Sequence, residues 1–393
     1  MPLLIRDRRY KTLHSFLELK GSTVMPEGRL SDVVGLKFNR HESFPPRFGW
    51  LHKAYLQVKK DEMLFHAPDA LVRLGVGKNM VYSMRYWSQA FKLTHEFRSA
   101  ETQARSLAAA PTWRARWLLD EDGADPYLED TGSLWLLHWW LVSGDKEARC
   151  LAPSWYVMFH LAPLARVTVE EMTALVTREV HSSFKREEWP AAESISRDVE
   201  CFIKMYAPDP EANPLSPGSF EDSLLCPFRE LGLLEYQSGR GKERAYRFTS
   251  GIRPSLPPRV LLHSCLDYAA RFSRKPDSIS LARLASEPGA PGRAFHMREP
   301  ELAQSIEAFV EAHPQLEIVE SLGQRSLRFA DNPEKLAWDI LDEQYGQVRE
   351  RDGFPTPEEW AGRNPGLKKT TDDEAEAAQG LFPQQAEMIE ELA

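Results

Sequence analysis

The amino-acid sequence predicts a mainly α-helical protein with short β hairpins. Apolar residues recur three and four positions apart over much of the chain, which is the spacing of one helix face. Gly-containing turns separate short runs of polar and apolar residues at 234–250 and at 316–329, and such runs favour hairpins. We therefore expect an N-terminal winged helix-turn-helix, a central helical domain and a candidate second winged-helix-like module.

The length of 393 residues allows two or three domains with cores of their own. Four prolines between residues 207 and 218 indicate one boundary. The expected divisions are a winged-helix-like DNA-binding domain at 1–100, a helical domain at 101–210, a helix-plus-hairpin domain at 211–335, and an acidic, partly mobile tail at 336–393.

Residues 67–93 give the strongest local pattern. A short helix is expected from Pro68, then a turn through Gly75 and Gly77, then a longer helix over 78–91. The apolar face of the longer helix consists of Met80, Met84, Trp87 and Phe91, at spacings of 4, 3 and 4. The remaining arc carries Lys78, Asn79, Tyr82, Ser83, Arg85, Tyr86 and Gln89. Such a cationic, amide-bearing and aromatic face on a second helix is typical of a protein that reads the DNA major groove.

The same stretch contains Gly75-Val76-Gly77-Lys78, which resembles the end of a phosphate-binding loop. Val72 stands where that loop needs Gly, and Asn79 stands where it needs Ser or Thr to bind magnesium. We therefore expect no nucleotide here, and the sequence indicates no cofactor elsewhere.

Cationic residues also surround the stiff Pro45-Pro46 pair that precedes the predicted helix near residue 50. These are Arg40, His41, Arg47 and Lys53, and they could contact DNA phosphates from the same end of the domain. The alternative is structural, because Arg47 and His41 could instead tie the loop to the core.

Later in the chain, the hairpin expected at 234–250 has a basic turn with Arg240, Lys242 and Arg244, which makes it a candidate second wing. A basic hairpin tip can also serve solubility alone. The other winged-helix-like pattern is three helices followed by a hairpin. The helices are expected at 261–272, 280–286 and 299–312, and the strands at 316–320 and 326–329.

The acids between residues 120 and 130 and the nearby His138 allow a metal-dependent hydrolase to be considered. The candidate ligands are Asp125, Glu129, Asp130 and His138. A simpler interpretation is that Asp130 or Thr131 caps a buried helix over 134–142 and that His138 is a core residue. No metal-binding spacing accompanies the acids, so we expect no metal site.

Charge is distributed unevenly along the chain. Residues 1–118 carry a net charge of +10 and the remainder −19, which gives −9 for the whole. A basic first third suggests a polyanion-binding surface in one domain. No apolar run reaches the roughly 20 residues that span a bilayer, and no signal-peptide core is evident, so we expect a cytoplasmic protein without a membrane partner.

Four segments together resemble a known family. They are RHESFPPRFGWLHKAY at 40–55, LVRLGVGKNMVYSMRYW at 71–87, DPYLEDTGSLWLLHWWL at 125–141 and SLLCPFRELGLL at 223–234. In this order they resemble a bacterial family known only as domain of unknown function number four thousand and seven. The resemblance implies an association with DNA phosphorothioation and phage-defence gene islands, and a partner resembling a phosphoadenylyl-sulfate reductase. It supplies no catalytic residues.

The leading hypothesis is therefore a non-catalytic subunit that binds double-stranded DNA in a DNA-modification or phage-defence system. The alternative is a protein-interaction scaffold that docks a sulfotransfer or restriction enzyme without binding DNA itself. A third is a metal-dependent nuclease built on the acids near residue 125.

Overall fold

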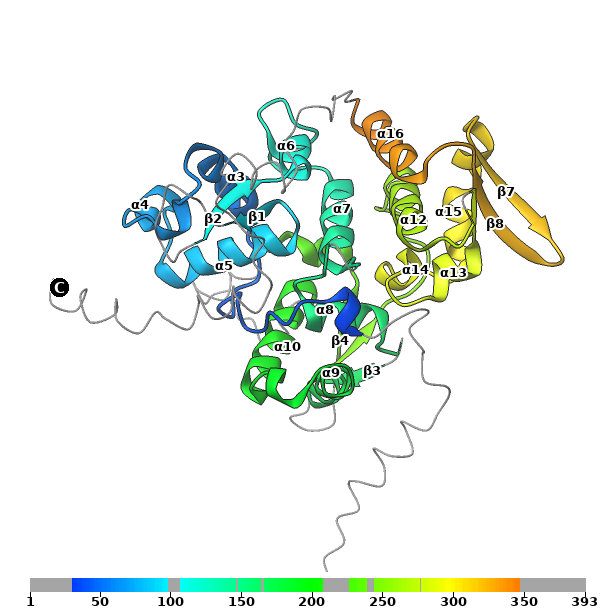
Figure 1. The fold of residues 1–393 in the computed structure, drawn as a ribbon. Coiled ribbons are helices and arrows are strands. Elements are labelled where there is room, and N and C mark those ends of the chain that lie inside the picture. Colours follow the sequence, from blue (N-terminus) through cyan, green and yellow to red (C-terminus); the bar gives the residue numbers. More distant parts are fainter. Residues whose placement is uncertain are drawn as a thin grey trace, which may run out of the picture.

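The computed structural model describes residues 30–97, 107–145, 148–163, 166–207, 226–238, 244–275 and 277–346. Over these residues the fold is mainly helical, with small antiparallel sheets, which agrees with the predicted class (Figure 1). Arg240 and Lys242 lie outside the described residues. No helix among the described residues is long and apolar enough to cross a membrane.

The first unit contains the predicted pair of helices. Its elements are α3 (Trp50–Lys60), η1 (Leu64–His66), α4 (Ala70–Leu74), α5 (Lys78–Ala90), β1 (Thr94–Phe97) and β2 (Ala108–Pro111). The short helix α2 (Leu30–Val33) precedes them and packs against a later helix over Val169–Ser183. Gly75 ends α4 in the left-handed conformation (φ 63°), which a residue without a Cβ adopts at little cost. β1 pairs antiparallel with β2, and the Ala109 N–H donates to the Glu62 carbonyl (2.8 Å) beside them.

The centre of the fold is α7 (Thr131–Val142), which follows α6 (Trp113–Leu119). Every residue of α7 from Gly132 onward is buried, as the apolar sequence on all sides of this helix predicts. Asp130 caps it by accepting a hydrogen bond from the Gly132 N–H (2.8 Å). In Figure 1, α7 lies between the first unit and the C-terminal helices, so it connects the two ends of the core.

One order of elements then occurs twice: a helix, a strand, two helices and a two-stranded hairpin. The first copy is α8 (Pro153–His160), β3 (Arg166–Thr168), α9 (Val169–Ser183), α10 (Ala192–Tyr206), β4 (Leu234–Ser238) and β5 (Arg244–Phe248), with η2 (Arg186–Glu188) and η3 (Pro227–Leu231) in its connections. The second is α12 (Pro258–Phe272), β6 (Ser278–Ser280), α13 (Leu281–Ser286), α15 (Glu299–Ala312), β7 (Leu316–Ser321) and β8 (Gln324–Phe329), with α14 (Pro291–Ala294) before α15.

The two sheets have matching orders, β3-β5-β4 and β6-β8-β7. In each, the strand between the first two helices pairs with the last strand of the hairpin, as Val167 does with Tyr246 and Ile279 with Leu327. The hairpin at 234–248 therefore pairs with β3, which precedes residue 210, across the boundary expected at 210/211.

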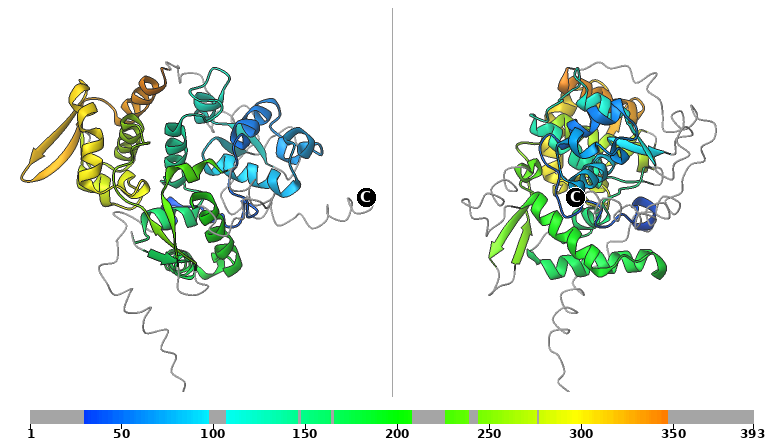
Figure 2. Two further views of the ribbon diagram at one scale, coloured as in Figure 1. Left: turned by 180° about the vertical axis from the view of Figure 1, so that it is seen from behind. Right: turned by 90° about the vertical axis from the view of Figure 1, so that its left-hand side faces the viewer.

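The last described helix, α16 (Pro333–Tyr345), packs against α12. It buries Leu336, Trp338 and Leu341, so the first residues of the segment expected as a tail belong to the core. The first unit and the β7/β8 hairpin lie at opposite ends of the molecule (Figures 1 and 2).

Candidate nucleic-acid interface

The N-terminal half of α5 is open to solvent. Lys78 and Asn79 are exposed and Tyr82 is 37% exposed, while Met84 and Trp87 are buried against the core. No acidic residue lies in the first turn of α5. Free N–H groups and the helix dipole make this end favourable for an anion, and the Lys78 ammonium adds a full positive charge.

Two residues assigned to the same face, Ser83 and Tyr86, are buried instead. The segment that follows the turn at residues 40–43 covers this side of α5, and the Phe44 carbonyl accepts hydrogen bonds from Ser83 Oγ (3.2 Å) and Trp87 Nε1 (2.9 Å). Tyr86 Oη donates to the Leu151 carbonyl (3.3 Å), and burial raises the pKa of its phenol well above the usual value. The prediction that these two residues contact DNA is therefore wrong for this fold.

Arg85 is committed to a neighbour within the protein. Its Nε lies 2.5 Å from Oε1 of Glu96 on β1, and Gln89 Nε2 donates to the same oxygen (2.8 Å). The side chains of Arg85 and Glu96 are 15% and 8% exposed. Because Glu96 neutralises Arg85, the open cationic part of α5 is confined to its first two turns.

Two other predicted cations lie on segments that pack against α5, and one of them, Lys53, lies beside its open end. Lys53 is exposed, and its Nζ donates to the Leu74 carbonyl at the end of α4 (3.0 Å), next to Gly75. The guanidinium of Arg47 lies over the rings of Trp50 (5.5 Å) and Phe44 (5.9 Å), so its position is fixed by the segment that contacts α5.

His41 has the structural role that the sequence left open. It is fully buried, and its Nδ1 accepts a hydrogen bond from the Ser43 N–H (3.0 Å), so its Nε2 carries the hydrogen and donates to Asp198 Oδ1 (2.9 Å). Asp198, on α10, also accepts from Ser154 Oγ (2.7 Å). The prediction of a DNA contact is wrong for His41, whereas Arg40, one residue earlier, is exposed.

The candidate second wing contributes less than expected. Among its three predicted cations the structure describes Arg244, which forms an ion pair with Glu200 of α10. An arginine already paired with a carboxylate attracts phosphate weakly, because its charge is balanced.

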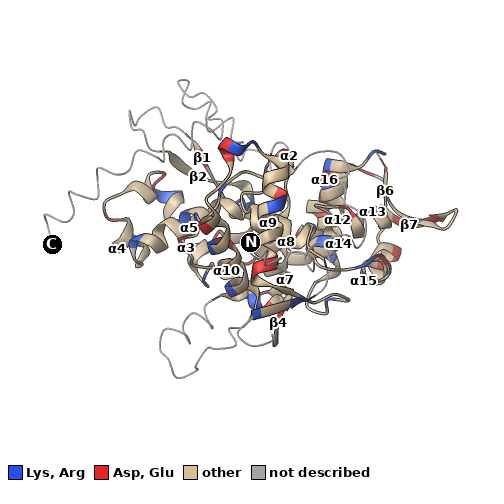
Figure 3. Ribbon diagram, turned by 90° about the horizontal axis from the view of Figure 1, so that it is seen from below, with Lys and Arg blue, Asp and Glu red and all other residues tan. Residues whose placement is uncertain are grey.

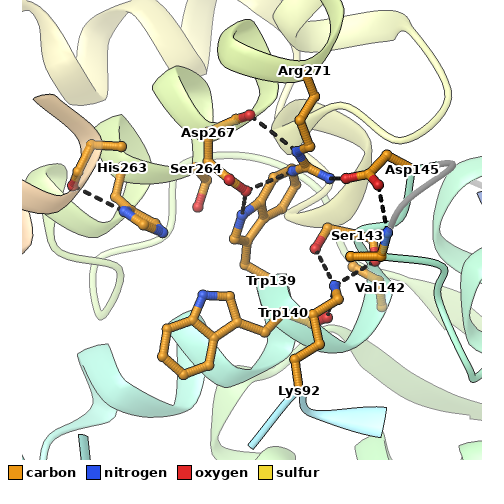
Figure 4. Close-up of polar contacts among 12 residues, drawn as sticks. Lys92, Trp139, Trp140, Val142, Ser143, Asp145, His263, Ser264, Asp267 and Arg271 are labelled. Carbon is orange, nitrogen blue, oxygen red and sulfur yellow. Dashed lines mark hydrogen bonds and ion pairs between the residues drawn. The ribbon is translucent and has the colours of Figure 1, made fainter. Parts of the chain in front are cut away.

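A buried network that the sequence did not predict fixes the C-terminal end of α5 (Figure 4). Lys92 Nζ donates to the carbonyls of Trp140 (2.6 Å) and Ser143 (2.7 Å) and to the Ser143 hydroxyl (2.9 Å). Burial, with the nearby Arg114 and Arg271 charges, lowers the pKa of Lys92 to about 7. The available signal was a lone lysine between Phe91 and Leu93, both apolar.

The C-terminal end of α7 is also bonded to α12, which follows it in the chain. Arg271 of α12 pairs with Asp267 (2.6 Å) and Asp145 (3.5 Å), and Asp267 accepts a hydrogen bond from Trp139 Nε1 (2.7 Å). The coulombic effect of Arg271 contributes to a pKa of about 2 for Asp267, although its burial acts in the opposite direction. The position of α5 is therefore defined relative to the whole core.

Comparison with known proteins identifies the family. The family described as "Protein of unknown function (DUF4007)" matches residues 38–345. The chain belongs to the DUF4007 family. It is similar to a solved structure described as "Magnesium ion-bound SspB crystal structure", with 55% identity, a TM-score of 0.78, and coverage of 90% of this chain and 98% of that one. A second, described as "SspB crystal structure", has 54% identity, a TM-score of 0.76, and coverage of 89% and 98%. No curated protein matches significantly.

The acids considered for a metal site have local structural roles in this DUF4007 protein. The two carboxylate oxygens of Asp125 accept hydrogen bonds from the Glu129 and Asp130 N–H groups (both 3.0 Å). His138 is fully buried between Tyr206 Oη (2.8 Å) and the Ala294 carbonyl (2.9 Å), and burial lowers its pKa to about 4. Among the described residues, no three His, Cys, Asp or Glu side chains are grouped so that they could hold a metal ion.

Proposed function

We propose that this protein binds double-stranded DNA through the N-terminal end of α5 and acts as a non-catalytic subunit of a bacterial DNA-modification or phage-defence system. The observation that supports it most directly is the open, acid-free first turn of α5, with Lys78, Asn79 and Tyr82 exposed. The phosphorothioation-type setting rests on the family resemblance described above.

In this proposal the first unit is a winged helix-turn-helix. Helices α3, α4 and α5 form its helical core, and the β1/β2 ladder takes the place of the wing. Asn79 and Tyr82 would approach base edges in the major groove, while Lys78, Lys53 and Arg47 would contact phosphates. The two repeated units would be further winged-helix-like modules, since their strand orders match each other and each hairpin follows its second and third helices.

The test is binding of the full-length protein to a labelled duplex over a range of salt concentrations. Lys78→Ala should weaken binding several-fold and reduce the slope of log affinity against log salt by about one, because one phosphate contact is lost. Lys275→Ala removes an exposed lysine from the opposite part of the fold and is the matched control. Wild-type affinity in both Lys78→Ala and Tyr82→Ala would overturn the proposed interface.

A second candidate function is magnesium-dependent cleavage of DNA, favoured by the magnesium ion bound to the 55% identical SspB protein. Magnesium commonly binds through one or two carboxylates together with water and substrate phosphates. Incubating supercoiled plasmid with the full-length protein tests it. Nicking that requires Mg²⁺ and stops with a chelator would support the second candidate, whereas intact plasmid across divalent metals would reject it.

A further inference from the structure

One face of the C-terminal repeated unit is acidic, in contrast to the open end of α5, whose first turn carries Lys78 and no acid. Its second long helix, α15, exposes Glu307 and Glu311, and its hairpin strand β7 exposes Glu317 and Glu320. Acidic positions on β7 and α15 are coloured red on the ribbon in Figure 3. A surface with this charge repels DNA phosphates, so the face between helix and hairpin is unsuited to a nucleic acid.

A groove of about 400 Å³ lies between α15 and β7. Its apolar lining is Val310, Leu316 and Ile318, its acidic lining is Glu307, Glu311, Glu317 and Glu320, and Arg325 is its one cation. Glu317 pairs with Arg328 (3.5 Å), and Arg325 pairs with Glu299 (3.4 Å). In the part of the chain that the structure describes, no ion pair involves Glu307, Glu311 or Glu320, so three carboxylates remain for an external cation.

One side of this groove is the open edge of a sheet. β7 is the outer strand in the order β6-β8-β7, and its hairpin closes at the Ser321–Gln324 pair. In such a hairpin, every second residue of the outer strand points its N–H and C=O groups away from the partner strand. The pairing register places Ile318 and Glu320 among these residues, so their main-chain groups point away from β8. The Leu316–Ser321 strand contains neither Pro nor Lys, which commonly protect edges from pairing.

The hairpin tip carries a further apolar group. Leu322 is fully exposed (102%) and has a left-handed backbone (φ 52°), next to Gly323 (φ 74°). Asn is favoured at such a position, whereas Leu gains no packing from the described residues that would offset its conformational cost. The hairpin projects from the end of the molecule opposite α5, where another protein could reach it (Figures 1 and 2).

We propose that the β7 edge and the adjoining groove bind an extended, cationic segment of a partner protein by adding it as a strand to the β6-β8-β7 sheet. Main-chain hydrogen bonds to Ile318 and Glu320 would set the register. Lys or Arg side chains at every second position of that segment would face the groove and pair with the three carboxylates, and their methylene stems would lie over Ile318. The residues between them would point away from the groove. This interface is independent of DNA binding at α5.

The test uses the full-length protein and a short labelled peptide in which Lys alternates with Thr and Val. We expect saturable binding that Glu307→Gln/Glu311→Gln/Glu320→Gln weakens about tenfold, because three charge contacts are lost. The matched control, Glu187→Gln/Glu193→Gln/Glu230→Gln, removes three exposed acids elsewhere and should retain wild-type affinity. Equal losses in both triple variants would show non-specific charge attraction and would overturn the proposal.

Strand addition is tested separately from charge. Two peptides of the same sequence, N-methylated at alternate amides in the two registers, keep the charge but lose different main-chain donors. At least one of the two methylated peptides should bind at least ten times more weakly than the unmethylated peptide. Ile318→Pro should also weaken binding, because it removes an outward N–H that β8 does not use. Equal binding of all three peptides, or a duplex DNA that competes for the groove, would reject the proposal.

Discussion

The Arg85 guanidinium on α5 and the Glu96 carboxylate on β1 form a largely buried ion pair, with 2.5 Å between Nε and Oε1. Arg85→Ala would remove this cation and leave the buried Glu96 carboxylate with the hydrogen bond from Gln89. We expect a loss of about 2 kcal/mol in the free energy of unfolding, because an uncompensated buried carboxylate is costly.

The same variant distinguishes a structural cation from a DNA-binding one. At a temperature where it is folded, Arg85→Ala should bind duplex DNA within about twofold of wild type, whereas Lys78→Ala should bind more weakly. Urea denaturation and fluorescence anisotropy measure the two properties. If Arg85→Ala is folded but binds DNA much more weakly than wild type, Arg85 contacts DNA and this prediction is wrong.

Lys92 predicts an alkaline dependence of stability. Its pKa is lowered to about 7 in the folded protein by burial, while the unfolded chain keeps the ordinary value near 10.5. Between these values the unfolded state binds more protons, so the free energy of unfolding should rise with pH. Relative to Lys92→Met, the wild-type protein should gain up to about 3 kcal/mol between pH 7 and pH 9. Parallel profiles of the two proteins would contradict this prediction.

His138 predicts an acid dependence. Burial lowers its pKa to about 4 from an ordinary 6.5, so the unfolded chain is protonated first as the pH falls. The contribution of His138 is therefore complete above pH 6.5 and is lost progressively toward pH 4, by up to about 3 kcal/mol. His138→Gln keeps a donor and an acceptor near Ala294 and Tyr206 but does not titrate. Its unfolding free energy should fall less steeply over this range, and an unchanged slope would contradict the assignment.

Leu322 predicts a stabilising substitution. Leu322→Asn should raise the free energy of unfolding by about 0.5–1 kcal/mol, because Asn tolerates the left-handed conformation and no internal packing is lost. Thermal unfolding of both proteins under identical conditions measures the change. A lower melting temperature would mean that Leu322 stabilises the fold itself.

Several parts of this fold followed from local sequence. The spacing of Met84, Trp87 and Phe91 gave the buried face of α5, and Gly75 marked the turn before it. The predicted helices and hairpin between 261 and 329 match α12, α13, α15, β7 and β8 closely. These features depend on neighbours within a few positions, and that is the range over which apolar periodicity and turn chemistry act.

The sequence by itself determined where helices such as α5, α7 and α15 form and that Met84, Trp87 and Phe91 of the 78–91 segment face the core. The tertiary structure decided which polar side chains remain in water, since Ser83 and His41 resemble surface residues in the sequence but bond to the Phe44 carbonyl and to Asp198. It also decided that β3 pairs with β5, far along the chain. A local pattern specifies that a group is polar, but its hydrogen-bond partner comes from whichever distant segment packs against it.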